Sequence, residues 1–143
     1  MNEIDLGGIE ASVIARIQAV FVQVNLTGVK VESYPNDAQS YVMPSNAVVL
    51  VRYRGRVFSV PENRQFNAQS CAIEVETFVM TRALKGNGGA YQILQAVTRA
   101  FVGYELFKDL RFYQIGEELI GESDGIFIYN QRFGASSVIR TTL

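Results

Sequence analysis

The sequence predicts an α+β fold in which two helices pack on a mostly antiparallel β-sheet. Two stretches, residues 6 to 24 and 88 to 106, carry apolar residues spaced three or four apart, as one face of a helix does. Between and after them, shorter runs alternate apolar and polar residues, as strands do. The length of 143 residues fits one domain, so a single domain is predicted over residues 1–143.

Each predicted helix has a recognisable apolar face. Asp5 stands where an N-cap residue binds the free amides of the first helix, and Gly28 ends that helix. The second helix follows a glycine cluster at residues 86 to 89. The residues predicted to face the core are Leu6, Ile9, Val13, Ile17, Val20, Phe21 and Val24 in the first helix and Ala90, Ile93, Leu94, Val97, Phe101 and Leu106 in the second.

The strands are predicted from alternation and from turn residues. VKVES, at 29–33, alternates briefly before Pro35 and predicts a short strand. AVVLVRYRGRVFSV, at 47–60, predicts a hairpin that turns at Arg54-Gly55, and a long strand follows over 71–84. In the C-terminal third, the predicted segments are 111–115, 118–121, 125–133 after the turn Ser123-Asp124-Gly125, and a last edge, SVIRT.

Composition excludes several classes of function. The sequence has no histidine, which removes histidine-dependent nucleophilic chemistry and the usual zinc sites. Its one cysteine, Cys71, is interpreted as a small buried residue, because a lone cysteine forms neither an intrachain disulfide nor a cysteine-rich metal site. The net charge of −1 gives no overall field that would attract nucleic acid or an anionic membrane. A non-enzymatic protein without metal or cofactor is therefore predicted.

The start of the chain bears on location. MNEIDLGGIE is acidic and lacks the basic start and apolar centre of a signal peptide. No window approaches the roughly 18 continuous apolar residues of a membrane span. The sequence therefore predicts a protein made in the cytoplasm, with no membrane partner.

KGNGGAY, at 85–91, is the best candidate for a phosphate-binding loop. A Walker A motif needs a lysine after its last glycine, and a dinucleotide fingerprint needs a glycine where Tyr91 stands. The favoured interpretation is a tight connection between a strand and a helix, with glycines at positive φ and Asn87 near the cap.

One face of the long strand changes character along its length. Glu74 and Glu76 are followed on the same face by Phe78 and Met80. Paired carboxylates can act in glycoside hydrolysis, but exposed acids are the norm, so a solvated pair is favoured. We expect the two acids to meet water, and Phe78 and Met80 to lie under the second helix or in a subunit interface.

Charge is segregated along the chain. Three arginines, Arg52, Arg54 and Arg56, are spaced two apart through the predicted hairpin and are expected to project together from its tip. Such a patch can contact nucleic-acid phosphates, meet an acidic protein surface, or stay solvated without a partner. An acidic surface is present in the same chain, since no lysine or arginine interrupts Glu117, Glu118, Glu122 and Asp124. Complementary patches at different places on one subunit are what a head-to-tail ring requires.

The combination of these segments resembles a known family. VVLVRYRGRVF, then AIEVETFVMTRALKGNGGAYQILQAV, then GIFIYNQRF are similar to the phage tail completion and terminator proteins. The resemblance is to a Mu-like small tail protein and, more distantly, to the lambda tail terminator, and it spans roughly residues 6 to 135. The sequence departs from the pattern at Ile128, where family members often place an aromatic residue before the tyrosine.

The resemblance implies a structural role in a virion tail or phage-like particle assembled in the bacterial cytoplasm. Tail terminators form rings, typically hexameric, that cap the head-proximal end of the tail tube and stop its polymerisation. The implied partners are further copies of the chain, the tube protein, and sheath and neck or head-completion proteins, with DNA only passing through the lumen. In this role the interface would use Arg52, Arg54, Arg56, Phe78, Met80 and the acidic segment. The alternative is a small nucleic-acid-binding module that uses the arginine-bearing hairpin.

Overall fold

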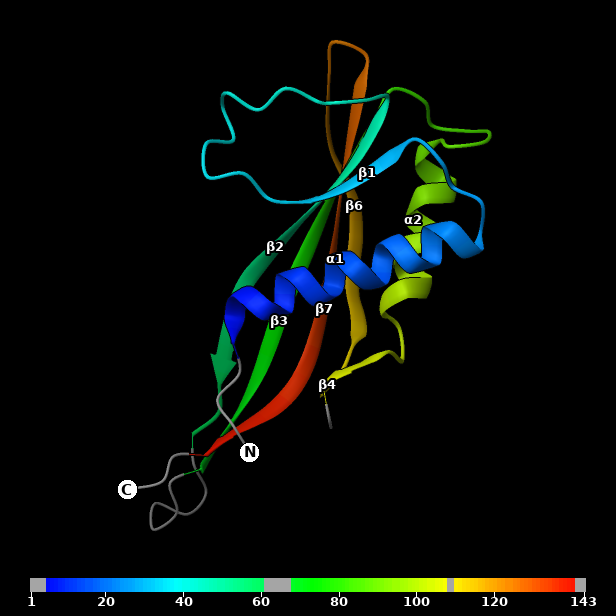
Figure 1. Ribbon diagram of the computed structural model, residues 1–143. Helices are drawn as coiled ribbons and strands as arrows, with labels where there is room; N and C mark the ends of the chain where they lie inside the picture. The colour runs from blue at the N-terminus through cyan, green and yellow to red at the C-terminus, as the bar shows by residue number, and fades with distance from the viewer. Residues whose placement is uncertain (1–4, 61–67, 108–109, 141–143) are drawn as a thin grey trace.

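The computed structural model describes residues 5–60, 68–107 and 110–140, and it shows an α+β fold (Figure 1). Its main element is a five-stranded sheet in the order β1-β2-β3-β7-β6, in which only the β1–β2 pair is parallel. The elements in chain order are α1 (Leu6–Gln23), β1 (Val29–Ser33), β2 (Ala47–Phe58), β3 (Ala68–Thr81), α2 (Ala90–Phe101), β4 (Glu105–Phe107), β5 (Leu110–Arg111), β6 (Tyr113–Ser123) and β7 (Ile126–Arg140). The predicted fold class is confirmed.

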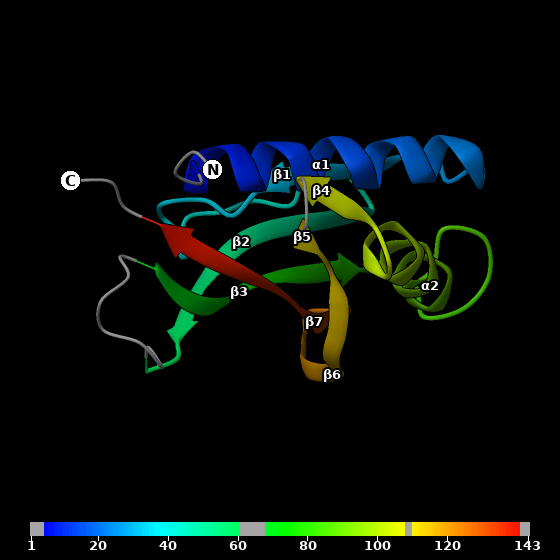
Figure 2. The same cartoon turned by 90° about the horizontal axis from the view of Figure 1, so that it is seen from below.

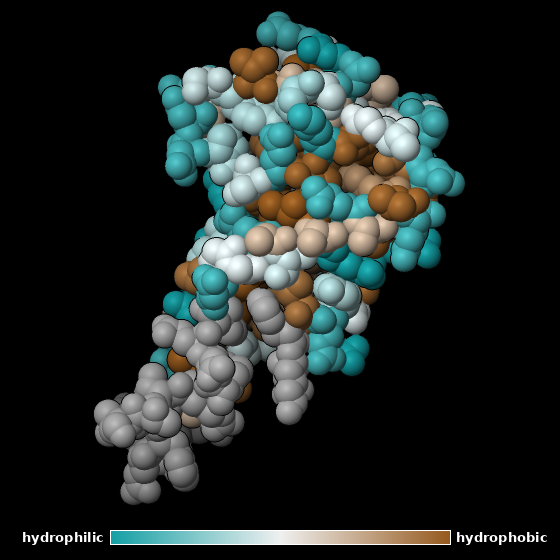
Figure 3. Space-filling model, in the orientation of Figure 1, coloured by the Kyte–Doolittle hydropathy of each residue, from teal (hydrophilic) through white to brown (hydrophobic). Residues whose placement is uncertain are grey.

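Both helices pack on the same face of the sheet. Figure 2 shows α1 as a layer along the sheet, with α2 beside it and seen nearly end-on. α1 contacts β1 and β2, α2 contacts β3, β7 and β6, and the helices also touch each other. In the view of Figure 3, apolar side chains gather in the upper part of the molecule, where the helices and sheet meet. Within the described residues, no helix is long and apolar enough to cross a membrane.

The predicted capping and apolar face of α1 are confirmed. The Asp5 side chain accepts a hydrogen bond of 3.1 Å from the Gly7 amide, which satisfies one free donor of the first turn. The buried stripe of the helix is Ile9, Val13, Ile17, Val20 and Phe21. In α2, the Phe101 ring stacks on the Phe133 ring of β7 with centroids 3.7 Å apart, which fixes the end of that helix against the sheet.

The predicted hairpin at Arg54-Gly55 is wrong. β2 continues without reversal from Ala47 to Phe58 and pairs with β3 along its whole length. Tyr53 pairs with Val75 and Gly55 with Glu74, so Arg54 is an extra residue in a β-bulge. Gly55 has φ +150°, and a glycine that supports this conformation in a bulge has the same sequence signature as one in a tight turn.

The two main strands of the C-terminal third, β6 and β7, are longer than predicted. The segments 111–115 and 118–121 fall mainly within the continuous β6, and 125–133 and SVIRT fall within β7, apart from the end of SVIRT, which lies outside the described residues. β6 has two bulges, between Gln114 and Gly116 and between Leu119 and Gly121, which interrupt the alternation of the sequence. The predicted turn is confirmed, with Asp124 and Gly125 both at positive φ as a tight hairpin requires.

One end of the sheet extends beyond the helices, at the lower left of Figure 1. β1 pairs only with Ala47–Val51 of β2, and β6 pairs only as far along β7 as Gly134. Past these points the sheet has three strands, β2, β3 and β7. We call this extension, residues 54–58, 68–74 and 135–140, the arm.

Candidate functional site

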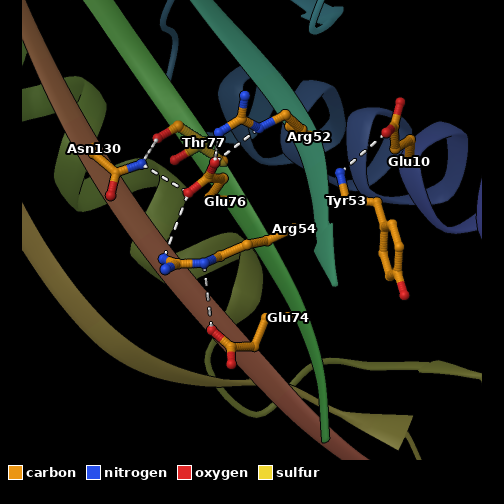
Figure 4. Close-up of polar contacts among 8 residues, drawn as sticks. All are labelled: Glu10, Arg52, Tyr53, Arg54, Glu74, Glu76, Thr77 and Asn130. Carbon is orange, nitrogen blue, oxygen red and sulfur yellow. Dashed lines mark hydrogen bonds and ion pairs between the residues drawn. The ribbon is translucent and has the colours of Figure 1, made fainter. Parts of the chain in front are cut away.

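A carboxylate network lies on the sheet face opposite the helices, centred on Glu76 of β3 (Figure 4). Glu76 is only 4% exposed. Its carboxylate accepts hydrogen bonds from the Arg52 guanidinium, with Nε at 2.8 Å, and from Asn130 Nδ2 at 3.4 Å. Arg54 Nη1 lies 3.7 Å from the same carboxylate, which therefore has two guanidinium groups around it.

The register of β2 on β3 builds this network. Arg52 pairs directly with Glu76 across the strands. The bulge then places Arg54 near both acids, so that its Nε lies 3.9 Å from a Glu74 oxygen. The Arg52 guanidinium also lies over the rings of Tyr34 and Phe78, at 4.6 and 5.1 Å from their centroids. These contacts hold Arg52 against the sheet by charge and by cation–π attraction.

The expectation that both acids meet water is wrong for Glu76, and Phe78 and Met80 do not lie under α2; their place in a subunit interface stays a prediction. Glu76, expected in water, is buried, and Glu74, also expected there, is partly buried, as are Phe78 and Met80. Alternate residues of a strand point to opposite faces, so Phe78 and Met80 lie away from the helices and not under α2. Each acid has an arginine within ion-pair distance, which fits a structural network better than an acid–base pair.

The three arginines do not project together. Arg52 and Arg54 lie with the two glutamates, whereas Arg56 pairs across the sheet with Ile73 and lies on the opposite face because of the bulge. Two of the three charges are thus compensated within the chain, and the phosphate-binding interpretation is left with Arg56 alone.

Arg56 belongs to an apolar part of the arm. Its guanidinium lies 5.1 Å from the centroid of the Phe58 ring. Val57 is 61% exposed and Phe58 45% exposed. Within the described chain, Arg56 has no carboxylate within 4.0 Å. The edge of the arm therefore combines an uncompensated positive charge with apolar surface.

The acidic segment lies on β6, at one edge of the sheet. The carboxyl-bearing side chains of Glu117, Glu118, Glu122 and Asp124 are exposed there. Apolar residues are exposed on the same strand, with Leu119 at 52% and Ile120 at 50%, and Tyr113 and Ile115 are also exposed. β6 is thus an edge that exposes both acidic and apolar side chains.

A second polar cluster, centred on Gln131 of β7, is absent from the sequence-based predictions. Gln131 is fully buried, and its Nε2 lies 3.1 Å from Leu94 O, 3.1 Å from Thr98 Oγ1 and 2.8 Å from Glu117 Oε1. It therefore joins α2 to the acidic strand across β7. The sequence feature that could have indicated this buried cluster is the amide pair Asn130-Gln131 inside the otherwise apolar run GIFIYNQRF.

The glycine cluster is a connection between β3 and α2, as expected. Gly89 is the N-cap residue of α2, and a Cβ atom there would lie 2.6 Å from the Lys85 carbonyl oxygen. Gly86 and Gly88 have positive φ. Close backbone packing therefore explains these glycines without a ligand.

Two further features of the sequence are Cys71 and its possible metal ligands. Cys71 is buried, as expected, and burial raises the pKa of its thiol. Among the described residues, no group of three or more cysteine and carboxylate side chains gathers where it could hold a metal ion.

Comparison with known proteins adds a family and a fold. Residues 13–141 match the model of a family described as Gp37 protein. Among solved structures, the fold is similar to that of a chain described as "Virion of native gene transfer agent (GTA) particle". That likeness has a TM-score of 0.58 and 16% sequence identity, and it covers 94% of this chain and 98% of the other. No curated protein matches.

Proposed function

This chain belongs to the Gp37 protein family, and from that premise we propose that it is a structural component of a phage-like particle. The observation that carries the proposal is the likeness of fold to a virion chain over almost the full length of both chains. The proposal agrees with the residues of the site, where the buried acids serve a structural network and the exposed features are surfaces for contact.

Within that particle, we assign the chain the role of a tail terminator. Copies form a ring, with six as the expected number, on the head-proximal end of the tail tube, and the ring stops addition of tube subunits. The tube protein is the first partner, and sheath and neck proteins follow. The support is the resemblance in sequence to tail completion proteins and the segregation of Arg56 from the acidic residues of β6.

The revised interface follows from the geometry. Arg52 and Arg54 form ion pairs with Glu76 and Glu74 inside the subunit, so Arg56 is the arginine that remains available to a partner. Phe78 and Met80 lie on the sheet face without helices, where a tube, neck or neighbouring subunit would cover them. The acidic residues of β6 supply the surface for a positively charged partner.

The experiment is tube polymerisation with the tube protein of the same particle. Added chain is expected to limit tube length in proportion to its concentration and to appear by electron microscopy as a ring at one tube end. Light scattering of the chain alone and with tubes gives its assembly state. A chain that stays monomeric, never binds tube ends and leaves tube length unchanged would exclude the role, whereas a monomer in isolation alone would not, because a terminator can assemble on the tube.

A further inference from the structure

We propose that copies of this chain join head to tail by strand addition, with the β2 edge of the arm in one subunit paired to β6 of the next. The inference rests on the proposed ring and specifies its contact. The partner is a second copy of this chain, and the two contributing segments are residues 54–58 and Tyr113–Ser123.

Both segments are free edges of the same sheet. β1 stops pairing with β2 at Val51, and the next available amide, that of Tyr53, donates to the Glu10 carboxylate of α1 at 3.0 Å (Figure 4). Beyond that hydrogen bond, the outer edge of residues 54–58 has no backbone partner in the described chain. Unpaired strand edges are templates for pairing with another chain.

β6 offers the second edge. It pairs with β7 on one side, and its other side makes no backbone hydrogen bond within the described residues. The exposed apolar residues Leu119 and Ile120 make this edge costly to leave in water. β6 has no lysine or proline, and its glutamates and two bulges leave Leu119 and Ile120 exposed, which fits a surface that is covered in an assembly.

The two edges are complementary in charge and in apolar character. Arg56, with Val57 and Phe58 beside it, lacks a carboxylate partner in the described chain. Glu118 and Glu122 on β6 lack a cationic partner there, beside Leu119 and Ile120. Arg56 and Glu122 point to the same face of the sheet, so pairing β2 of the arm with β6 brings the arginine toward Glu122 and covers apolar side chains of both edges.

The same charges disfavour the symmetric alternatives. Pairing β6 with a second β6 would bring Glu117, Glu118 and Glu122 against their own copies, and pairing arm with arm would place Arg56 near Arg56. Like charges on opposed strands are destabilising. β2 and β6 lie toward opposite sides of one sheet, so their contact is head to tail and can close into a ring.

Cross-linking with single cysteines tests this contact in a Cys71→Ala background. Phe58→Cys and Leu119→Cys place thiols at exposed positions of the two edges and on the same face of the sheet, and Val22→Cys, exposed at the end of α1, is the control. With a short bis-maleimide, a mixture of the Phe58→Cys and Leu119→Cys variants is expected to give cross-linked dimers. Neither variant alone should do so, and the chain carrying both cysteines should give a ladder that ends at the ring. Mixtures with Val22→Cys should give none.

A charge exchange supplies an independent measurement. Arg56→Glu is expected to weaken self-association on the order of tenfold, and Glu122→Arg in the same chain, on the same face of the sheet, should restore a part of it. Both side chains lie at the surface, so circular dichroism should show an unchanged fold.

The outcomes separate this inference from the terminator role. Rings that cap tubes without a Phe58–Leu119 cross-link, or a cross-link formed by Phe58→Cys alone, overturn the strand addition and leave the role intact. Head-to-tail cross-linking by a chain that never affects tubes supports the contact and overturns the role. No association under any condition, with or without tubes, overturns both.

Discussion

At Glu76, a charged residue is held out of water on a sheet face that the helices do not cover. The carboxylate is tolerated there because Arg52, Arg54 and Asn130 surround it. A buried ion pair adds little net stability, but removing one partner leaves the other without compensation. The network therefore acts mainly to fix β2, β3 and β7 in one register.

Glu76→Gln is expected to lower the free energy of unfolding by about 1–3 kcal/mol, because Arg52 and Arg54 lose the charge that both approach. The value lies toward the low end because the Arg52 side chain is 43% exposed, and water compensates part of the loss. Urea denaturation followed by circular dichroism measures it.

Glu74→Gln is the matched control, since its carboxylate lies 3.9 Å from Arg54 and is less buried. Its expected cost is under about 1 kcal/mol. Equal losses from the two substitutions would contradict the central position of Glu76.

The burial of Glu76 could not be predicted from the sequence, and the reason is physical. Alternation shows which residues share a face of one strand, but not which residues oppose them on the next. The register that puts Arg52 beside Glu76, with Arg54 added by a bulge, joins residues 24 positions apart. The capping by Asp5 was predictable because donor and acceptor are two residues apart.

At the scale of elements, the bulge in β2 decides where the arginines lie. Without the extra residue, Arg52, Arg54 and Arg56 would all share one face, because alternate residues do. With it, Arg56 moves to the opposite face and away from the glutamates. One inserted residue thus separates a structural pair of charges from a charge available to a partner.

Gly55→Ala is expected to destabilise the chain by about 1–2 kcal/mol, because residue 55 has φ +150°, a conformation that side chains rarely adopt. A Cβ atom there meets no neighbour within 4 Å, so backbone strain is the whole cause. Thermal and urea unfolding measure the loss.

Gly121→Ala provides the comparison, because Gly121 also borders a bulge, meets nothing within 4 Å and lacks a positive φ. Its effect should stay within about 0.5 kcal/mol. A smaller loss from Gly55→Ala than from Gly121→Ala would contradict the strain argument.

The elements that the sequence predicted well are those whose pattern is complete within the element. α1 and β1 belong to this group, since spacing of three or four and a short alternation can be read locally. The second helix was predicted too long, because α2 ends at Phe101 and Leu106, expected on its apolar face, lies in β4. The lengths of β6 and β7 were underestimated because Gly116, Gly121 and the bulges interrupt alternation where pairing continues. Arg54-Gly55 suggested a turn because a glycine with unusual φ serves bulges and turns alike.

For the whole molecule, the arm and the helix-covered body should differ in local stability. The outer part of the arm, residues 57–58, 68–70 and 136–139, has no fully buried side chain, whereas Cys71, Ile73 and Ala135, nearer the helices, belong to the main apolar core. Segments with few buried apolar contacts open with a lower free energy than the core does.

Hydrogen exchange tests this difference and the assembly together. In the free chain, amides of residues 136–139 in β7 should exchange faster than those of Val75–Val79 in β3. After assembly, residues 54–58 and Tyr113–Ser123 should gain protection, whereas α1 should not change. Protection of α1 without protection of either edge would contradict the proposed contact.

The proposed function draws on the sequence and on the fold in different ways. Composition excluded chemistry that depends on histidine and a strong electrostatic field of the whole chain. The proposed role comes from the resemblance in sequence to tail completion proteins. The surface that can contact a partner is visible only in the three-dimensional structure, because sequence position does not reveal that Arg52 and Arg54 are ion-paired within the chain while Arg56 is not.

The bulges in β2 and β6 have a consequence for the number of subunits. In a ring closed edge to edge, each subunit is a wedge, and the angle between its two joining edges fixes how many wedges complete the circle. A bulge bends and twists its own strand, and this chain has bulges in both joining strands, at Tyr53/Gly55 and at Leu119/Gly121. The circumference of the ring would then be set by inserted backbone residues, and removing one of them would change the count of copies and also turn the side chains that follow it to the other face of the strand.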